Sequence, residues 1–228
     1  MYPHRIRLRG PWECEPVVAG SFMPRRVIMP ARWHDAGLVG FTGEARFTRK
    51  FGFPGRADET EHIWITCDGV TGLLQVSLNG VRFASEPMTG FDFDATAVMA
   101  ARNQLEVIIH GVDEGAGLWG EVAMEIRKDA FLADVRLEQI DGIWHILGQA
   151  VGVADRELEL YTLIDNRNAD YRTITPKVAG EPFAVPLPTI SSANHAVRID
   201  LINVSTVWYA VEIPIPHWRN AGGCDITD

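Results

Sequence analysis

The sequence has little cysteine. Its 228 residues include three, Cys14, Cys67 and Cys224, which are odd in number, far apart and never in a C-x-x-C pair. This pattern excludes a disulfide framework and does not indicate a zinc site. Cys67 lies in the apolar run HIWITC, so we expect it to be a small buried core residue.

Long hydrophobic runs are also missing. No stretch of about 18 apolar residues occurs, which excludes a transmembrane helix. The N-terminus, MYPHRIRLRGPWE, lacks the apolar segment of a signal peptide. The formal net charge of −9 disfavours nucleic acid as a partner, because phosphate binding needs a basic face. Together these absences predict a cytoplasmic protein that binds neither membrane nor nucleic acid.

Helical periodicity is scarce, and short alternating runs separated by turns predict an all-β protein. In the first half, such runs span residues 45–53, 74–78, 105–109 and 122–126. Asn79-Gly80 predicts a type I′ hairpin turn, with a return strand at 81–84. One short helix is expected at 96–101, with Asp94 as its N-cap. Residues 11–40 contain four prolines and are expected to wrap irregularly across the sandwich.

The side-chain alternation predicts which residues face the core. Leu74, Val76 and Leu78 are expected on one face of their strand. Acidic residues such as Glu121 and Glu125 alternate with apolar residues, so they are expected to face solvent.

A domain boundary is expected near Arg127-Lys128-Asp129, which gives domains 1–128 and 129–228. Beyond it the same pattern continues, with a hairpin turn at Asp141-Gly142. Six strands are predicted, at 135–140, 144–153, 157–164, 172–178, 195–202 and 207–213. That number and length suit an immunoglobulin-like sandwich.

Five segments follow one another along the first half: RLRGPWECEP, MPARWHDAGLVGFTGEARFTRKFGFP, HIWITCDGVTGLLQVSLNGVRF, FDFDATAVMAARNQLEVII and GLWGEVAMEI. In this order they resemble the N-terminal domain of family 2 glycoside hydrolases, the β-galactosidase and β-glucuronidase group. The resemblance implies a galactose-binding-like jelly roll, and the second half is similar to the immunoglobulin-like domain that follows it in that family.

The same resemblance bears on catalysis. In that family the acid/base and nucleophile glutamates lie on a C-terminal TIM barrel, which needs about 250 residues. Two sandwiches leave no room for a barrel in 228 residues. The expectation is therefore a pair of accessory domains without the catalytic domain.

A sugar site needs an exposed aromatic face and a few polar groups. Trp33 and Trp119 are expected in loops, and Trp33 can act with His34 and Asp35. The alternative for Trp119 is that it only closes the end of the sandwich. The family resemblance adds two loops that reach toward the sugar, Thr89–Gly90 and Asp113–Glu114 here. The candidate carbohydrate-binding residues are Trp33, His34, Thr89, Asp113, Glu114 and Trp119.

Other chemistries have weaker signals. Gly115, Gly117 and Gly120 form G-x-G-x-x-G, but the following EVAMEI alternates like a strand, so these glycines are expected to shape a loop rather than bind a dinucleotide. The histidines are scattered and form no metal motif. We therefore predict neither a metal nor a cofactor.

The sequence thus predicts a non-catalytic carbohydrate-binding protein. One alternative is a protein–protein assembly module, which pairs with a separate hydrolase or with a second copy of itself. Another is a glycoside hydrolase whose site is built from the sandwich itself, with Asp113 or Glu114 as its carboxylates.

Overall fold

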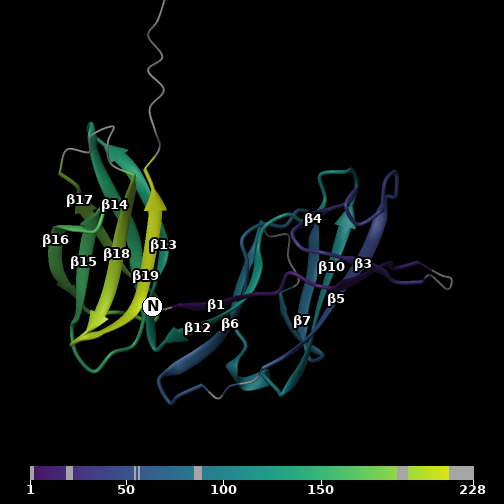
Figure 1. Ribbon diagram of the computed structural model, residues 1–228, viewed down its shortest axis with the longest axis horizontal. Coiled ribbons are helices and arrows are strands. Elements are labelled where there is room, and N and C mark those ends of the chain that lie inside the picture. The colour runs from purple at the N-terminus through teal and green to yellow at the C-terminus, as the bar shows by residue number, and fades with distance from the viewer. Residues whose placement is uncertain are drawn as a thin grey trace, which may run out of the picture. The chain divides into compact units, whose positions relative to one another are not determined.

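The computed structural model describes residues 3–18, 23–53, 55, 57–84, 89–188 and 195–215. Over these ranges the chain consists of β-strands, loops and one 3₁₀ turn, which confirms the all-β class. The chain divides into two compact units, one formed by His4–Ile126 and the other mainly by the chain from Arg127 onward. Each unit contains two main sheets (Figure 1). No helix in the described ranges is long and apolar enough to span a membrane.

The first unit pairs a four-stranded sheet with a six-stranded sheet. The four-stranded sheet has the order β1 (His4–Arg7), β12 (Val122–Lys128), β6 (Glu61–Cys67) and β9 (Phe91–Asp94). The six-stranded sheet has the order β3 (Arg25–Val27), β2 (Trp12–Pro16), β5 (Gly43–Gly52), β10 (Arg102–Gly111), β7 (Leu73–Leu78) and β8 (Val81–Ala84). A separate short pair joins β4 (Ala31–Arg32) to β11 (Gly117–Leu118).

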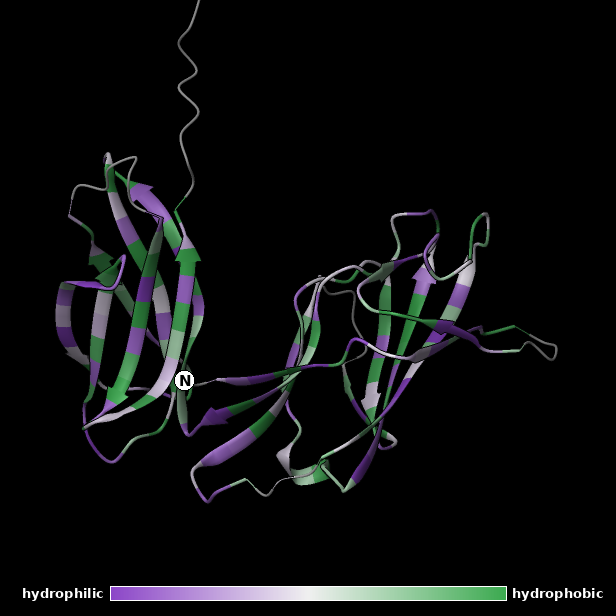
Figure 2. Cartoon of the chain, in the orientation of Figure 1, coloured by the Kyte–Doolittle hydropathy of each residue, from purple (hydrophilic) through white to green (hydrophobic). Residues whose placement is uncertain are grey.

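The core of the first unit lies between these two sheets. Ile63 and Ile65 from β6 share one buried cluster with Phe47 from β5 and Leu105 from β10. The alternation of polar and apolar residues along the strands is visible in Figure 2. Cys67 is 4% exposed, as expected for a core residue, and burial raises the pKa of its thiol to about 12. Cys224 lies outside the described residues.

The antiparallel pair β5–β10 forms the longest ladder of this unit. Its register runs from Gly52 opposite Arg102 to Gly43 opposite Gly111. At about 3.3 Å per residue, these two ends lie roughly 30 Å apart. The loops of the unit therefore gather at two well-separated ends, a Gly111 end and an Arg102 end.

The Asn79-Gly80 turn is confirmed, with positive φ angles of 51° and 83° between β7 and β8. The expected inward position of Leu74 is wrong. A bulge in the β10–β7 ladder pairs Ile108 with Gln75 but Ile109 with Leu73, which leaves Leu74 as the extra residue. As a result Leu73 is buried, while Leu74 is 36% exposed.

Two other local expectations need correction. Residues 11–40 are less irregular than predicted, because β2 pairs with both β3 and β5. The short helix is a 3₁₀ turn over Thr96–Val98, and Ala95 occupies its N-cap position. Asp94 still orders this turn, since its Oδ1 accepts the backbone N–H of Thr96 at 2.8 Å.

The second unit pairs a three-stranded sheet with a four-stranded sheet. The orders are β13 (Ala130–Ile140), β14 (Ile143–Gly152) and β17 (Glu181–Pro186), and β16 (Arg167–Ile174), β15 (Leu158–Ile164), β18 (Ala196–Asn203) and β19 (Thr206–Pro214). Asp141 and Gly142 form the predicted hairpin turn with positive φ. The unpredicted strand is β17, which contains Pro182 and Pro186 and lies at a sheet edge, where missing N–H donors are tolerated.

An ion-pair network around Arg5 joins strand β1 to the rest of the first unit. The guanidinium donates to Glu125 at 2.5 Å, to Asp68 at 2.7 Å and to Glu121 at 2.9 Å. Burial opposes the charge of Arg5, but the hydrogen bond that Arg5 donates to Asp68 and the nearby carboxylates outweigh it, so the pKa of Arg5 is raised above its ordinary value. The expectation that Glu125 faces solvent is wrong, because its side chain is 3% exposed against Arg5.

We predict that Arg5→Met destabilises the chain far more than Arg7→Met. The first change removes the guanidinium from a buried carboxylate, which costs about 3 kcal/mol. Arg7 is 56% exposed and pairs with Glu121, so its loss should cost less than about 1 kcal/mol. Urea unfolding of both variants measures the difference. Equal losses of stability in the two variants would mean that the ion pairs of Arg5 contribute no more than an ordinary surface ion pair.

A second stability prediction concerns Gly111, which lies against the ring of Trp33. A Cβ at Gly111 would overlap the indole, whereas a Cβ at Gly52, at the other end of the ladder, would find its nearest neighbour at 3.6 Å. We expect Gly111→Ala to cost about 1–3 kcal/mol through overpacking, and Gly52→Ala to cost little. Chemical denaturation of the two alanine variants provides the comparison. Wild-type stability in Gly111→Ala would contradict the burial of Trp33.

Candidate functional site

Trp33 does not form the exposed sugar platform expected from the sequence. Its side chain is fully buried, and its Nε1–H donates to the Phe41 carbonyl at 2.8 Å. The ring stacks on Phe41 with centroids 6.3 Å apart, and Gly111 covers it closely. Trp33 therefore closes the core at the Gly111 end and offers no surface to a ligand.

His34 is exposed next to this buried indole. Its Nε2 lies 2.8 Å from Asp35 Oδ1, and both side chains are about half exposed. The other carboxylate oxygen of Asp35 accepts the backbone N–H of Arg32 at 2.9 Å. His34 and Asp35 thus remain accessible polar groups, but without the aromatic partner that the sequence suggested.

Among the described residues at this end, Trp119 is the large aromatic side chain that is exposed to solvent. It is 40% exposed, and its indole Nε1–H donates to Thr71 Oγ1 at 2.9 Å. The Arg32 guanidinium carbon lies 5.5 Å from the ring centroid, within range of a cation–π interaction. Gly69 packs against the ring so closely that a Cβ there would overlap it. The indole is therefore held in one orientation while part of its surface stays open.

Backbone hydrogen bonds bring the Thr89 loop to the same place. Thr71 and Gly117 exchange backbone hydrogen bonds of 3.0 and 3.2 Å, and Gly120 donates to Gly69 at 2.8 Å. The Val70 N–H donates to the Thr89 carbonyl at 2.9 Å. The exposed Thr89 therefore lies beside the segment that supports Trp119.

The Asp113–Glu114 loop is also attached to this cluster. Asp113 Oδ1 accepts the Gly115 N–H at 2.7 Å, so this carboxylate orders its own loop. Arg32 Nη1 donates to the Gly115 carbonyl at 2.9 Å, which joins the loop to the cation beside Trp119. Both Asp113 and Glu114 are exposed.

These residues define what we call the Trp119 rim: Trp119, Thr71, Arg32, Thr89 and Asp113. Thr71 and Arg32 were missed by the sequence reasoning. Arg32 precedes Trp33 in the sequence, but its role became visible only through the β4–β11 pair, in which Arg32 lies opposite Gly117. Two exposed apolar residues belong to the same end of the unit, Val112 (69%), which follows β10, and Val39 (67%).

The G-x-G-x-x-G sequence shapes this rim and opens no helix. Gly117 belongs to β11, and the segment after Gly120 is strand β12, as expected from its alternation. Gly120 packs against Gly69, where no Cβ would fit. Among the described residues, no three His, Cys, Asp or Glu side chains cluster as metal ligands.

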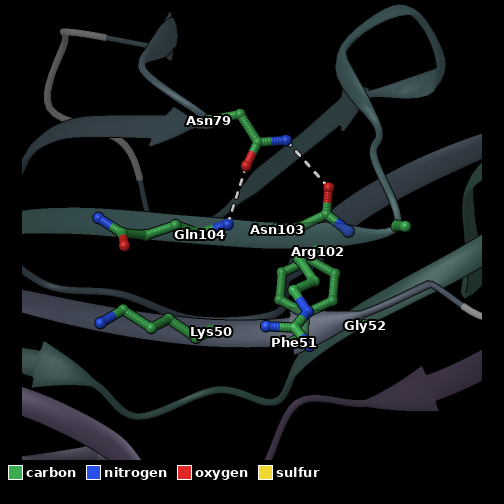
Figure 3. Close-up of a pocket in the computed structure, with 8 residues that line it drawn as sticks. Lys50, Phe51, Gly52, Asn79, Arg102, Asn103 and Gln104 are labelled. Carbon is green, nitrogen blue, oxygen red and sulfur yellow. Dashed lines mark hydrogen bonds between the residues drawn. The ribbon is translucent and has the colours of Figure 1, made fainter.

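A cavity of about 580 Å³ lies at the opposite end of the β5–β10 ladder (Figure 3). The sequence reasoning did not identify it, because its walls come from three separate segments. Its lining residues are Lys50, Phe51, Gly52, Asn79, Ala101, Arg102, Asn103 and Gln104.

No family model and no curated protein matches the chain. Its fold does match solved glycosidase structures. A putative β-galactosidase from Bacteroides fragilis aligns over 94% of this chain and 41% of its own length, with a TM-score of 0.73 and 13% identity. A GH2 β-galacturonidase from Eisenbergiella tayi, bound to galacturonate, aligns over 95% and 44%, with a TM-score of 0.76 and 15% identity.

A β-glucuronidase from Ruminococcus gnavus aligns over 94% of this chain and 46% of its own length, with a TM-score of 0.66 and 13% identity. The chain therefore spans less than half the length of these structures. At this level of identity the likeness concerns the fold. The chain has the β-sandwich fold of a segment of the GH2 glycosidases, as its sequence motifs predicted.

Proposed function

We propose that the chain is a carbohydrate-binding accessory part of a glycosidase-like protein and that the Trp119 rim is its binding surface. In this interpretation the first unit is a galactose-binding-like jelly roll and the second is an immunoglobulin-like sandwich. The observation that carries the proposal is the fixed, 40% exposed indole of Trp119 on a fold shared with glycosidases.

The chemistry of the rim suits a sugar. The C–H face of a pyranose packs on an indole, while its hydroxyl groups need a few fixed polar partners. Thr71 and Arg32 are held next to the indole, and Thr89 and Asp113 are exposed on the flanking loops. An open rim of this kind, with one aromatic residue, suits weak binding of about 1 mM, or roughly −4 kcal/mol.

The exposed apolar residues at the same end support a second candidate function. Trp119, Val112 and Val39 could form a contact surface for another polypeptide, because grouped exposed apolar side chains mark interaction sites. Under this alternative, Trp119→Ala would change the association state of the chain rather than its response to sugars.

We predict that Trp119→Ala weakens binding of galactosides or glucuronides at least tenfold, which corresponds to about 1.4 kcal/mol. Thr71→Val should have a smaller effect, since it removes the partner that orients the indole. Calorimetric titration at millimolar sugar measures both changes.

Tyr171→Ala is the matched control, because Tyr171 is a 51% exposed aromatic residue in the second unit. It should bind sugar as the wild type does. A flat wild-type titration, or full binding by Trp119→Ala, would contradict the proposal. If light scattering then showed a stable oligomer that Trp119→Ala dissociates, the assembly function would replace it.

A further inference from the structure

The cavity at the Arg102 end of the β5–β10 ladder is lined by basic side chains, although the chain as a whole is acidic. It shares Lys50 with an adjoining depression of about 170 Å³, which is lined by Pro11, Glu13, Arg26, Thr48, Arg49 and Lys50. The two depressions together are lined by four basic side chains and one acidic side chain, although the whole chain carries a net charge of −9. A positive surface of this kind attracts an anion.

The walls of the cavity are held in place by an amide network (Figure 3). Asn79 Oδ1 accepts the Gln104 N–H at 2.9 Å, and Asn79 Nδ2 donates to Asn103 Oδ1 at 2.9 Å and to the Val98 carbonyl at 2.8 Å. Asn103, which is 3% exposed, makes two further hydrogen bonds with the backbone of Ala100. These contacts fix the hairpin turn to the start of β10, so the cavity is already formed without a ligand.

Two cations project from neighbouring strands at this site. The register places Gln104 opposite Lys50 and Arg102 opposite Gly52, so Lys50 and Arg102 are diagonal neighbours, roughly 7–8 Å apart at Cα. Both side chains are exposed. Two carboxylates, Glu13 on β2 and Glu106 on β10, flank β5 close to Lys50, and Glu106 accepts the Gln104 Nε2–H at 2.6 Å.

Arg49 also lines the adjoining depression. Its Nη1 donates to the Pro11 carbonyl at 2.8 Å, while its buried Nε–H has no acceptor among the described residues. Burial lowers the pKa of Arg49. An anion nearby would relieve this desolvated charge.

We propose that this cavity is a second ligand site, which binds a small molecule through a carboxylate held by Arg102 and Lys50. A guanidinium pairs with a carboxylate through two parallel hydrogen bonds, and an ammonium adds a point charge. The half-buried Phe51 also lines the cavity, and its side chain packs partly against the core. A volume of about 580 Å³ lies within the range for small-molecule sites.

The test is a titration of the whole chain followed by the backbone amide resonances of Gln104 and Asn79. Three probes are compared at one ionic strength: glucuronate, glucose as its neutral counterpart, and citrate as a carboxylate without a sugar. We expect saturable shifts with glucuronate and none at these amides with glucose. Raising the salt from 50 to 300 mM should weaken binding several-fold, because exposed charges are screened.

Substitutions distinguish binding at this site from a general electrostatic attraction of anions to the chain. Arg102→Ala should weaken binding at least tenfold, and Arg102→Lys should restore part of it, because the charge returns without the bidentate geometry. Arg167→Ala removes an exposed arginine from β16 of the second unit and should bind as the wild type does. Both positions are on the surface, so the folded spectrum of all three variants should persist.

The outcomes assign the ligand and decide the proposal. Binding of glucuronate alone would identify an acidic sugar, and equal binding of citrate would identify a general carboxylate site. The absence of saturation by about 50 mM, or equal losses in Arg102→Ala and Arg167→Ala, would overturn the proposal. Trp119→Ala should leave these shifts unchanged, so failure of sugar binding at the Trp119 rim does not affect this result.

Discussion

The pairing of β5 with β10 is the constraint on which the rest of the first unit depends. Ten residue pairs, from Arg102 opposite Gly52 to Gly111 opposite Gly43, join the middle of the six-stranded sheet. Their inward side chains, such as Phe47, Val107 and Ile109, are fully buried. The same ladder determines which loops meet at each end. The Trp119 rim and the Lys50–Arg102 cavity are separate because β5 and β10 extend from one to the other.

At the Gly111 end, one tryptophan is buried in the core and another is exposed to solvent. Trp33 is enclosed by Phe41, Phe47 and Gly111, and this burial closes the core. Trp119 lies on the outside, where Gly69 and Thr71 hold its ring. Arg32 connects the two, because it precedes Trp33, lies beside the Trp119 ring and donates to the Gly115 carbonyl. A rigid interior thus supports the exposed aromatic face of Trp119.

Local signals in the sequence were sufficient for much of the fold. Asn79-Gly80 and Asp141-Gly142 both form the predicted turns, because a positive φ at two successive residues depends on the residues themselves. Long-range features were not accessible in this way. The bulge that exposes Leu74 depends on how β7 meets β10, and β17 is obscured by its two prolines. The burial of Glu125 depends on Arg5, which is 120 positions away.

The candidate site shows the same limit. Trp33 and Trp119 both lie near glycines in the sequence, and only tertiary packing distinguishes the buried ring from the exposed one. The cavity at the other end was hidden for a similar reason. Asn79 could be recognised as a turn residue, but its hydrogen bonds to Asn103 and Gln104 join segments that are 24 and 25 residues apart.

The most direct test of the account follows the indole N–H resonances of the seven tryptophans during a sugar titration. Trp119→Phe identifies the Trp119 signal by its disappearance. The account predicts that this resonance shifts saturably as sugar is added, because its N–H lies at the rim and is bonded to Thr71. The Trp33 resonance should stay in place, since its N–H is bonded to Phe41 and its ring is buried. A Trp119 signal that does not move at saturating sugar, in a chain that remains folded, would contradict carbohydrate binding at this site.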